Sequence, residues 1–167
     1  MSFIRTSIPA NLRSSRLGQA VPKAELRQLD QIATMIDIKE GRRIITEAAP
    51  GRECFVIVDG EFAVDGPGVH ATVGAGEVTG ELALLTGRRR NASVVAASDA
   101  AVYVMHPREF ATLMSTAPEF CDHVVSAASG RLGSEPVTLP AQFVGKRRSP
   151  VETRPSWSAQ LTDAPRR

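Results

Sequence analysis

The alternation of apolar and polar residues first indicates a helix near the N-terminus. Over residues 21–36, apolar side chains recur every three or four positions and Pro22 stands near the start, which predicts one amphipathic helix. Residues 1–20 mix Ser, Pro, Asn and Arg without any such period. We therefore expect a flexible arm before the helix.

From residue 42 to residue 105 the pattern changes to short apolar runs separated by turn residues. Pairs such as Pro50-Gly51 and Asp59-Gly60 supply the fixed and positive φ angles that tight turns need. Many short strands at close spacing are typical of a β-sandwich or barrel. The runs are Arg42–Glu47, Cys54–Val58, Glu61–Val64, Val69–Val73, Ala92–Ala97 and Ala101–Met105.

Three helical stretches complete the pattern. Residues 80–85 are good helix formers between two turn sequences, so we expect a single helical turn set among the strands. Residues 107–114 and 118–132 each begin with proline and predict two further helices, and an exposed apolar face on the second would allow a homodimer. Five prolines and little periodicity in residues 134–167 predict a disordered tail, or one that folds on a partner.

Length and composition restrict the class of protein. A chain of 167 residues suffices for one domain, which we place at residues 21–133, between the arm at 1–20 and the tail at 134–167. No apolar run approaches the roughly 20 residues of a membrane-spanning helix, and the N-terminus lacks the apolar core of a secretion signal. We therefore expect a cytoplasmic protein without a membrane span.

Charge and residue types argue against several functions. Residues 1–133 contain 14 Lys and Arg against 15 Asp and Glu, so the excess positive charge lies in the tail. A nearly neutral body argues against specific DNA binding. The two cysteines and three histidines lack the spacing of metal ligands, and no nucleophile stands with a base. We therefore expect neither a metal site nor an enzyme.

The segment Gly80–Val94 has the most informative chemistry. Free amide groups at the start of the short helix, near Leu82 and Ala83, could hold a phosphate, and Arg90 could complete the phosphate site. Glu81 would repel a phosphate, so its oxygens should accept from another group, such as a ribose hydroxyl. A phosphate and a hydroxyl on one ligand indicate a nucleotide. Without these neighbours, the three consecutive arginines would indicate only an exposed basic loop.

This segment resembles the phosphate-binding cassette of cyclic-nucleotide-binding domains, which occur in protein kinase A regulatory subunits and bacterial catabolite activators. Residues 80–85 match the family's Gly-Glu-Leu-Ala-Leu-Leu, Arg90 matches its phosphate-binding arginine, and residues 92–94 match the Ala-Ser-Val that follows. Residues 51–61 resemble the family's turn-strand-turn signature, and residues 110–118 resemble its hinge helix.

The resemblance extends over residues 22–130 and implies a mainly β fold, an eight-stranded, jelly-roll-like β-roll with flanking helices. It implies cyclic AMP or cyclic GMP as the ligand, with no other cofactor. In the family pattern Glu81 binds the ribose 2′-hydroxyl and Arg90 the cyclic phosphate, while Asn91 leaves the choice of nucleotide open. Backbone contacts are implied for Gly80, Leu82, Ala83, Asn91 and Ala92, and positions near the sugar and base for Val73 and Val78.

We therefore expect a sensor that binds a cyclic nucleotide and signals to a protein effector through rearrangement of the C-terminal helices or through the tail. One alternative is a protein-interaction module of the same fold with little or no nucleotide binding, which docks a partner through the tail and Trp157. Another is a transcription-regulator-like protein that uses the basic tail on DNA, although the sequence shows no recognition-helix pattern.

Overall fold

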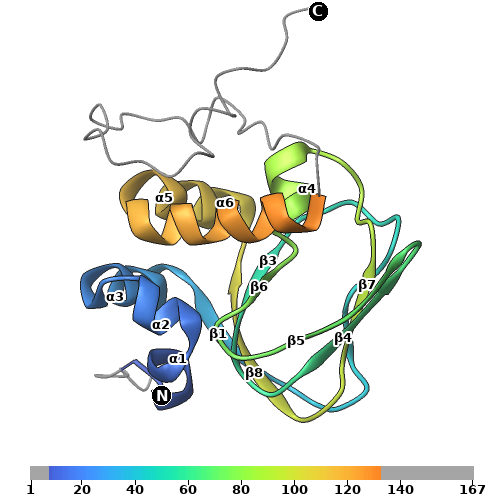
Figure 1. The fold of residues 1–167 in the computed structure, drawn as a ribbon, viewed down its shortest axis with the longest axis horizontal. Coiled ribbons are helices and arrows are strands. Elements are labelled where there is room, and N and C mark those ends of the chain that lie inside the picture. The colour runs from blue at the N-terminus through green and yellow to red at the C-terminus, as the bar shows by residue number, and fades with distance from the viewer. Residues whose placement is uncertain (1–7, 133–167) are drawn as a thin grey trace, which may run out of the picture.

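The fold combines two four-stranded antiparallel sheets with a layer of helices (Figure 1). The computed structural model describes residues 8–132. The strands are β1 (Thr34–Ile38), β2 (Arg43–Ile45), β3 (Cys54–Asp59), β4 (Phe62–Gly66), β5 (Val69–Val73), β6 (Val78–Thr79), β7 (Ser93–Ala96) and β8 (Ala100–Met105). The helices are α1 (Ala10–Ser14), α2 (Arg16–Ala20), α3 (Lys23–Ile32), α4 (Glu81–Thr86), α5 (Pro107–Thr116) and α6 (Pro118–Leu132).

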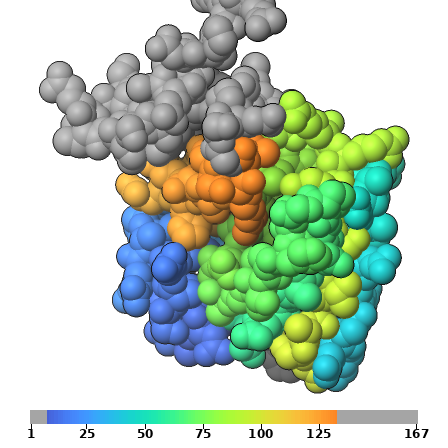
Figure 2. Space-filling model, turned by 45° about the vertical axis from the view of Figure 1, so that its right-hand side comes forward, coloured from blue at the N-terminus to red at the C-terminus, as the bar shows by residue number. Residues whose placement is uncertain are grey.

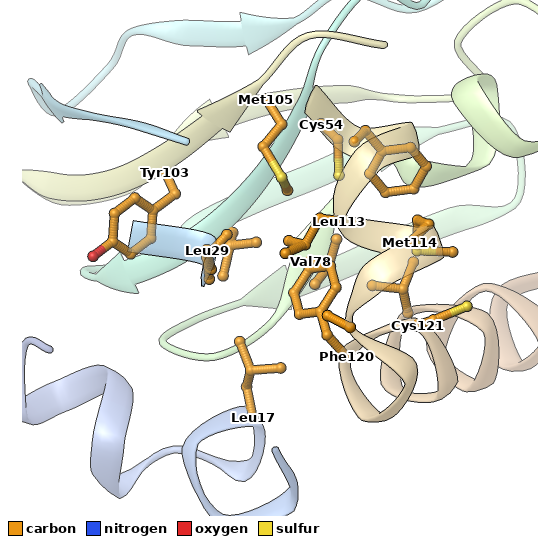
Figure 3. Packing of buried hydrophobic residues seen from close by; sticks show 14 of the residues in the cluster. Leu17, Leu29, Cys54, Val78, Tyr103, Met105, Leu113, Met114, Phe120 and Cys121 are labelled. Atoms are coloured by element: carbon orange, nitrogen blue, oxygen red, sulfur yellow. The ribbon is translucent and has the colours of Figure 1, made fainter. Parts of the chain in front are cut away.

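The first sheet, in the order β1-β8-β3-β6, separates two apolar cores. Alternate residues of β3 face opposite ways. Cys54 and Val56 pack toward the helices, whereas Phe55 and Ile57 pack toward the second sheet. Figure 3 shows part of the core on the helical side, where Cys54 lies among side chains from several helices. Burial of both faces explains the unbroken apolar sequence of β3.

The second sheet, in the order β2-β7-β4-β5, closes the roll on the side away from the helices (Figure 1). β4 and β5 form an antiparallel hairpin in which Phe62 stands opposite Val73. Both side chains are buried in the core between the sheets, together with Val94 of β7. The hairpin therefore forms one wall of the interior of the roll.

Helices from both ends of the described chain cover the outer face of the first sheet. Figure 2 shows α6, in orange, bordering both the blue N-terminal helices and the green segments of the roll. Phe110 of α5 and Phe120 of α6 are fully buried in this layer. Within residues 8–132, no helix is long and apolar enough to cross a membrane.

The predicted eight-stranded roll with flanking helices is confirmed, but the helix predicted over residues 21–36 is too long. The chain becomes extended at Ala33, so α3 ends at Ile32 and residues 34–38 pair with β8 instead. The β-branched residues Ile36 and Ile38 favour this strand. Local apolar spacing could not distinguish the end of the helix from the start of the strand.

Residues 10–20 also differ from the predicted flexible arm. They form α1 and α2, because Leu12 and Leu17 are fully buried in the helical core. The exposed apolar face predicted on residues 118–132, which would allow a dimer, is not observed. The large apolar residues of this helix lie inside the chain's own core. The tail at 134–167 lies outside the described residues, and the domain boundaries stay a prediction.

Candidate functional site

A cavity of about 160 Å³ opens inside the roll, between the β4–β5 hairpin, α4 and the end of α6. Apolar side chains from the strands form most of its wall. Two arginines and one glutamate supply the charged groups. The lining residues are Ile45, Val64, Val69, Ala71, Val73, Thr79, Gly80, Glu81, Leu82, Ala83, Arg90, Asn91, Ala92, Val94 and Arg131.

Gly80 connects β6 to α4 in a conformation that favours glycine. Its φ is 85°, and a Cβ added here would lie 2.8 Å from both Arg90 Nη1 and the carbonyl oxygen of Glu53. The absent side chain therefore lets the guanidinium approach the backbone at the start of the helix. Leu82 and Ala83, in the first turn of α4, line the cavity directly beside it.

Arg90 is held in place by backbone oxygens. Its Nη1 donates to the carbonyl of Gly80 at 2.8 Å, and its Nη2 donates to the carbonyl of Glu53 at 2.6 Å. Burial lowers the pKa of the guanidinium, but an arginine keeps its charge at neutral pH. Five N–H groups are available on a guanidinium, so these two bonds leave donors for an anion in the cavity.

Glu81 is the other charged residue of the cavity, and it is completely buried. Its Oε1 accepts a charge-assisted hydrogen bond from Arg131 Nη1. Its Oε2 has no hydrogen-bond partner among residues 8–132. Burial raises the pKa of this carboxyl, and the charge of Arg131 opposes that rise. A buried acceptor without a donor is uncommon in folded proteins and marks a place where a ligand hydroxyl would fit.

Eight of the nine residues predicted for the site line this one cavity, and Val78 does not. The eight are Val73, Gly80, Glu81, Leu82, Ala83, Arg90, Asn91 and Ala92. Successive residues of a strand point to opposite faces, so Thr79 faces the cavity while Val78 packs into the helical core, as Figure 3 shows. Of these two neighbours, Thr79 and not the predicted Val78 lines the cavity.

The sequence prediction missed seven residues of the cavity wall. Six come from the roll, and the alternation of Val69, Ala71 and Val73 along β5 is a signal that could have found part of them. Arg131 had no such signal, because it lies 50 residues from Glu81 and only the packing of α6 brings the two together. The missed residues are Ile45, Val64, Val69, Ala71, Thr79, Val94 and Arg131.

The residues near the cavity were also examined for a metal site and for a reactive cysteine. Across residues 8–132, no group of three His, Cys, Asp or Glu side chains is arranged to hold a metal ion. Burial raises the pKa of the Cys54 thiol. The charge of Glu81 raises this pKa further, and the charge of Arg90 opposes the rise. A buried thiol in that state is a poor nucleophile.

Comparison with known proteins gives a family for this site. Residues 35–117 match the family model of the cyclic nucleotide-binding domain. The chain is 31% identical over 99 residues to a cyclic nucleotide-gated potassium channel of Rhizobium etli, covering 59% of this chain and 28% of the channel. It is 31% identical over 118 residues to such a channel of Mesorhizobium japonicum, covering 71% and 33%. A cGMP-dependent protein kinase of Caenorhabditis briggsae is 41% identical over 70 residues, covering 40% and 9%.

Solved structures agree with this assignment. One, from a study of a cyclic-GMP-dependent signalling pathway that regulates bacterial phytopathogenesis, has a TM-score of 0.57 and 25% identity, covering 66% of this chain and 93% of that one. The catabolite activator protein of Thermus thermophilus shares the fold, with a TM-score of 0.61 and 20% identity over 71% and 58%. The chain spans at most 33% of the length of the curated relatives that it matches. Through residues 35–117, the chain belongs to the cyclic nucleotide-binding domain family.

Proposed function

We propose that the cavity binds cyclic AMP or cyclic GMP. One observation carries this proposal: a buried arginine with free donors and a buried carboxylate with an unpartnered oxygen face the same small cavity. A cyclic nucleotide offers an anionic phosphate and a ribose hydroxyl on one rigid ring system.

Each part of the nucleotide has a counterpart in the cavity wall. Arg90 binds the cyclic phosphate, assisted by backbone amides of Leu82, Ala83 and Ala92. Glu81 accepts a hydrogen bond from the 2′-hydroxyl of the ribose. The apolar side chains of the β4–β5 hairpin, including Val73, contact the sugar and base. Asn91, which is exposed at the edge of the cavity, lies where base selectivity would be set.

Beyond binding, we propose that the chain is a regulatory protein of the cytoplasm and that it performs no catalysis. The helices α5 and α6 repack when the cavity fills, and a protein effector reads the change through them or through the tail. The ligand can shift this equilibrium only by the difference between its affinities for the two states. Among the relatives, two potassium channels are gated by cyclic nucleotides and one kinase depends on cGMP, which supports a regulatory role.

Isothermal titration calorimetry with cyclic AMP and with cyclic GMP tests the proposal. The protein should bind at least one of them, and Arg90→Gln should weaken binding by roughly 10- to 100-fold, as expected for losing hydrogen bonds from a charged donor. Arg89→Gln is the matched control. Its side chain donates to the carbonyl of Ala48 in the same loop but does not line the cavity, so its affinity should stay unchanged.

A well-folded protein that binds neither nucleotide would overturn the proposal. Circular dichroism of each variant establishes that Arg90→Gln still folds, which matters because Arg90 also donates to the backbone at Gly80 and Glu53. An equal loss in Arg89→Gln and Arg90→Gln would show that binding depends on general positive charge and not on the cavity.

A further inference from the structure

Thr79 is the last residue of β6, and its side chain points into the roll. It stands opposite Phe55 of β3, and residues directly opposite each other in an antiparallel pair share one face of the sheet. Phe55 packs into the core between the two sheets. Thr79 therefore lies on the inner face of the first sheet, where it lines the cavity together with its neighbour Gly80.

The hydroxyl of Thr79 is buried without a protein partner. The residue is 5% exposed, and its hydroxyl makes no hydrogen bond within residues 8–132. In the described part of the chain, the fully enclosed side-chain oxygens that lack a partner belong to Gln28 and Glu81 only. The hydroxyl of Thr79 is therefore not fully enclosed, and the small surface that it keeps faces the cavity.

Packing alone does not account for a threonine at this place. Taking a hydroxyl out of water without giving it a hydrogen bond costs free energy. Valine has nearly the same shape and would line this largely apolar wall without that cost. A buried polar group that has no partner in the protein calls for an explanation, and a hydrogen bond to a ligand in the cavity supplies one.

The guanidinium of Arg90 indicates which part of a ligand the hydroxyl would meet. Its Nη1 donates at 2.8 Å to the carbonyl of Gly80, the residue that directly follows Thr79. The guanidinium and the hydroxyl line the same cavity. A phosphate that binds to Arg90 carries oxygens that accept hydrogen bonds, and a threonine hydroxyl can donate one.

We propose that Thr79 is a further ligand-binding residue, whose hydroxyl donates a hydrogen bond to an oxygen of the cyclic phosphate held by Arg90. This inference rests on the proposed function. It adds a neutral donor from β6 to the charged donor from the loop before β7. Cyclic AMP and cyclic GMP carry the same phosphate, so Thr79 contributes to affinity for both and not to the choice of base.

Calorimetry of the full chain and its variants with both nucleotides tests this inference. Thr79→Val should weaken the binding of each nucleotide by about 10-fold, as expected for the loss of one hydrogen bond to a charged group. Thr79→Ser keeps the hydroxyl and should bind within about 3-fold of the unmodified protein. Thr72→Val is the matched control, because Thr72 is exposed on β5 and does not line the cavity.

Two further measurements separate a ligand contact from a structural role. In urea, Thr79→Val should unfold at the same or a higher denaturant concentration than the unmodified protein, because its hydroxyl has no bond within residues 8–132 to lose. The two phosphorothioate diastereomers of the nucleotide each replace one phosphate oxygen with sulfur, a weaker acceptor. Thr79→Val should narrow the difference in affinity between the parent nucleotide and one diastereomer only.

The outcomes distinguish this inference from the proposed function. Weaker binding of both nucleotides by Thr79→Val, with Thr79→Ser and Thr72→Val close to the unmodified protein, supports the phosphate contact. Unchanged binding by Thr79→Val, a loss confined to one nucleotide, or a lower urea midpoint overturns the contact while leaving the binding function intact. A difference between parent and diastereomers that narrows for neither also overturns it. If the unmodified protein and every variant bind neither nucleotide, the proposed function fails and the Thr79 contact fails with it.

Discussion

The two ends of α6 are both held by a buried glutamate, but in different ways. At the start of the helix, the carboxylate of Glu25 from α3 accepts hydrogen bonds from the backbone amides of Glu119 at 3.3 Å and Phe120 at 2.8 Å. Both oxygens of Glu25 are used. At the far end, Glu81 uses one oxygen on the side chain of Arg131, and the other has no partner among the described residues.

This difference separates a fixed end from an end held by one side chain. The amides in the first turn of α6 have no acceptor within the helix, so Glu25 satisfies donors that no helical carbonyl reaches. Phe120 and Cys121 are fully buried at this end. A long side chain at a helix end can leave its acceptor by changing rotamer. The start of α6 is therefore held by backbone hydrogen bonds and by packing, whereas its end is held to α4 by a single side-chain pair.

Emptying the fixed end should have the largest effect. Phe120→Ala removes a fully buried aromatic side chain from the helical core and should lower the free energy of unfolding by about 3–5 kcal/mol. Urea denaturation measures the change. Glu119→Gln, at the exposed neighbouring position, is the control and should change stability by less than about 0.5 kcal/mol. A loss below about 1 kcal/mol in Phe120→Ala would show that this end is not anchored by packing.

Removing the acceptor at the fixed end should have an intermediate effect. Glu25→Ala leaves the two amides at the start of α6 without their partner and should lower the free energy of unfolding by about 1–2 kcal/mol. Arg27→Ala on the exposed side of the same helix controls for changes in α3 itself. If both variants lose the same stability, the bonds from Glu25 to α6 contribute nothing specific.

The smallest effect concerns pH. Burial raises the pKa of both Glu25 and Glu81 above the ordinary value of 4.5. The folded state therefore holds protons at pH values where the unfolded chain has lost them, so the free energy of unfolding should rise as pH falls from the raised pKa values toward 4.5. Glu25→Gln and Glu81→Gln should each flatten this slope in denaturation series. Glu40→Gln, an exposed position, should leave it unchanged, and a slope unaffected by all three replacements would contradict the assignment.

Sequence reasoning worked best where a continuous local pattern of residues forms a whole strand. The apolar run of Cys54–Val58 predicted β3, and turn residues marked most of the neighbouring strands. It did less well where tertiary packing decides the structure. The two-residue strand β6 is too short to produce a period, and β1 begins directly after α3, so an apolar spacing of three or four continued across the boundary. The helices α1 and α2 are short and depend on burial of Leu12 and Leu17.

The candidate site shows the same contrast between residues placed by local sequence and residues placed by tertiary packing. The cassette is continuous in sequence, so its residues were found together, and the cavity contains all of them from Gly80 to Ala92 that were predicted. Val78 was misplaced because the two-residue periodicity of β6 turns it away from the cavity. Arg131 was missed because its place depends on how a helix that begins at Pro118 packs against the roll. No local pattern contains that information.

The double burial of β3 limits how this protein could be shortened. The family match stops at residue 117, but Cys54, Val56 and Val58 are covered by helices that lie partly outside the range 35–117. A fragment trimmed to the matched range would present that strand face and its neighbours on β8 to water. Such a surface favours self-association, so the smallest fragment that behaves as a monomer should begin near α1 and continue through α6.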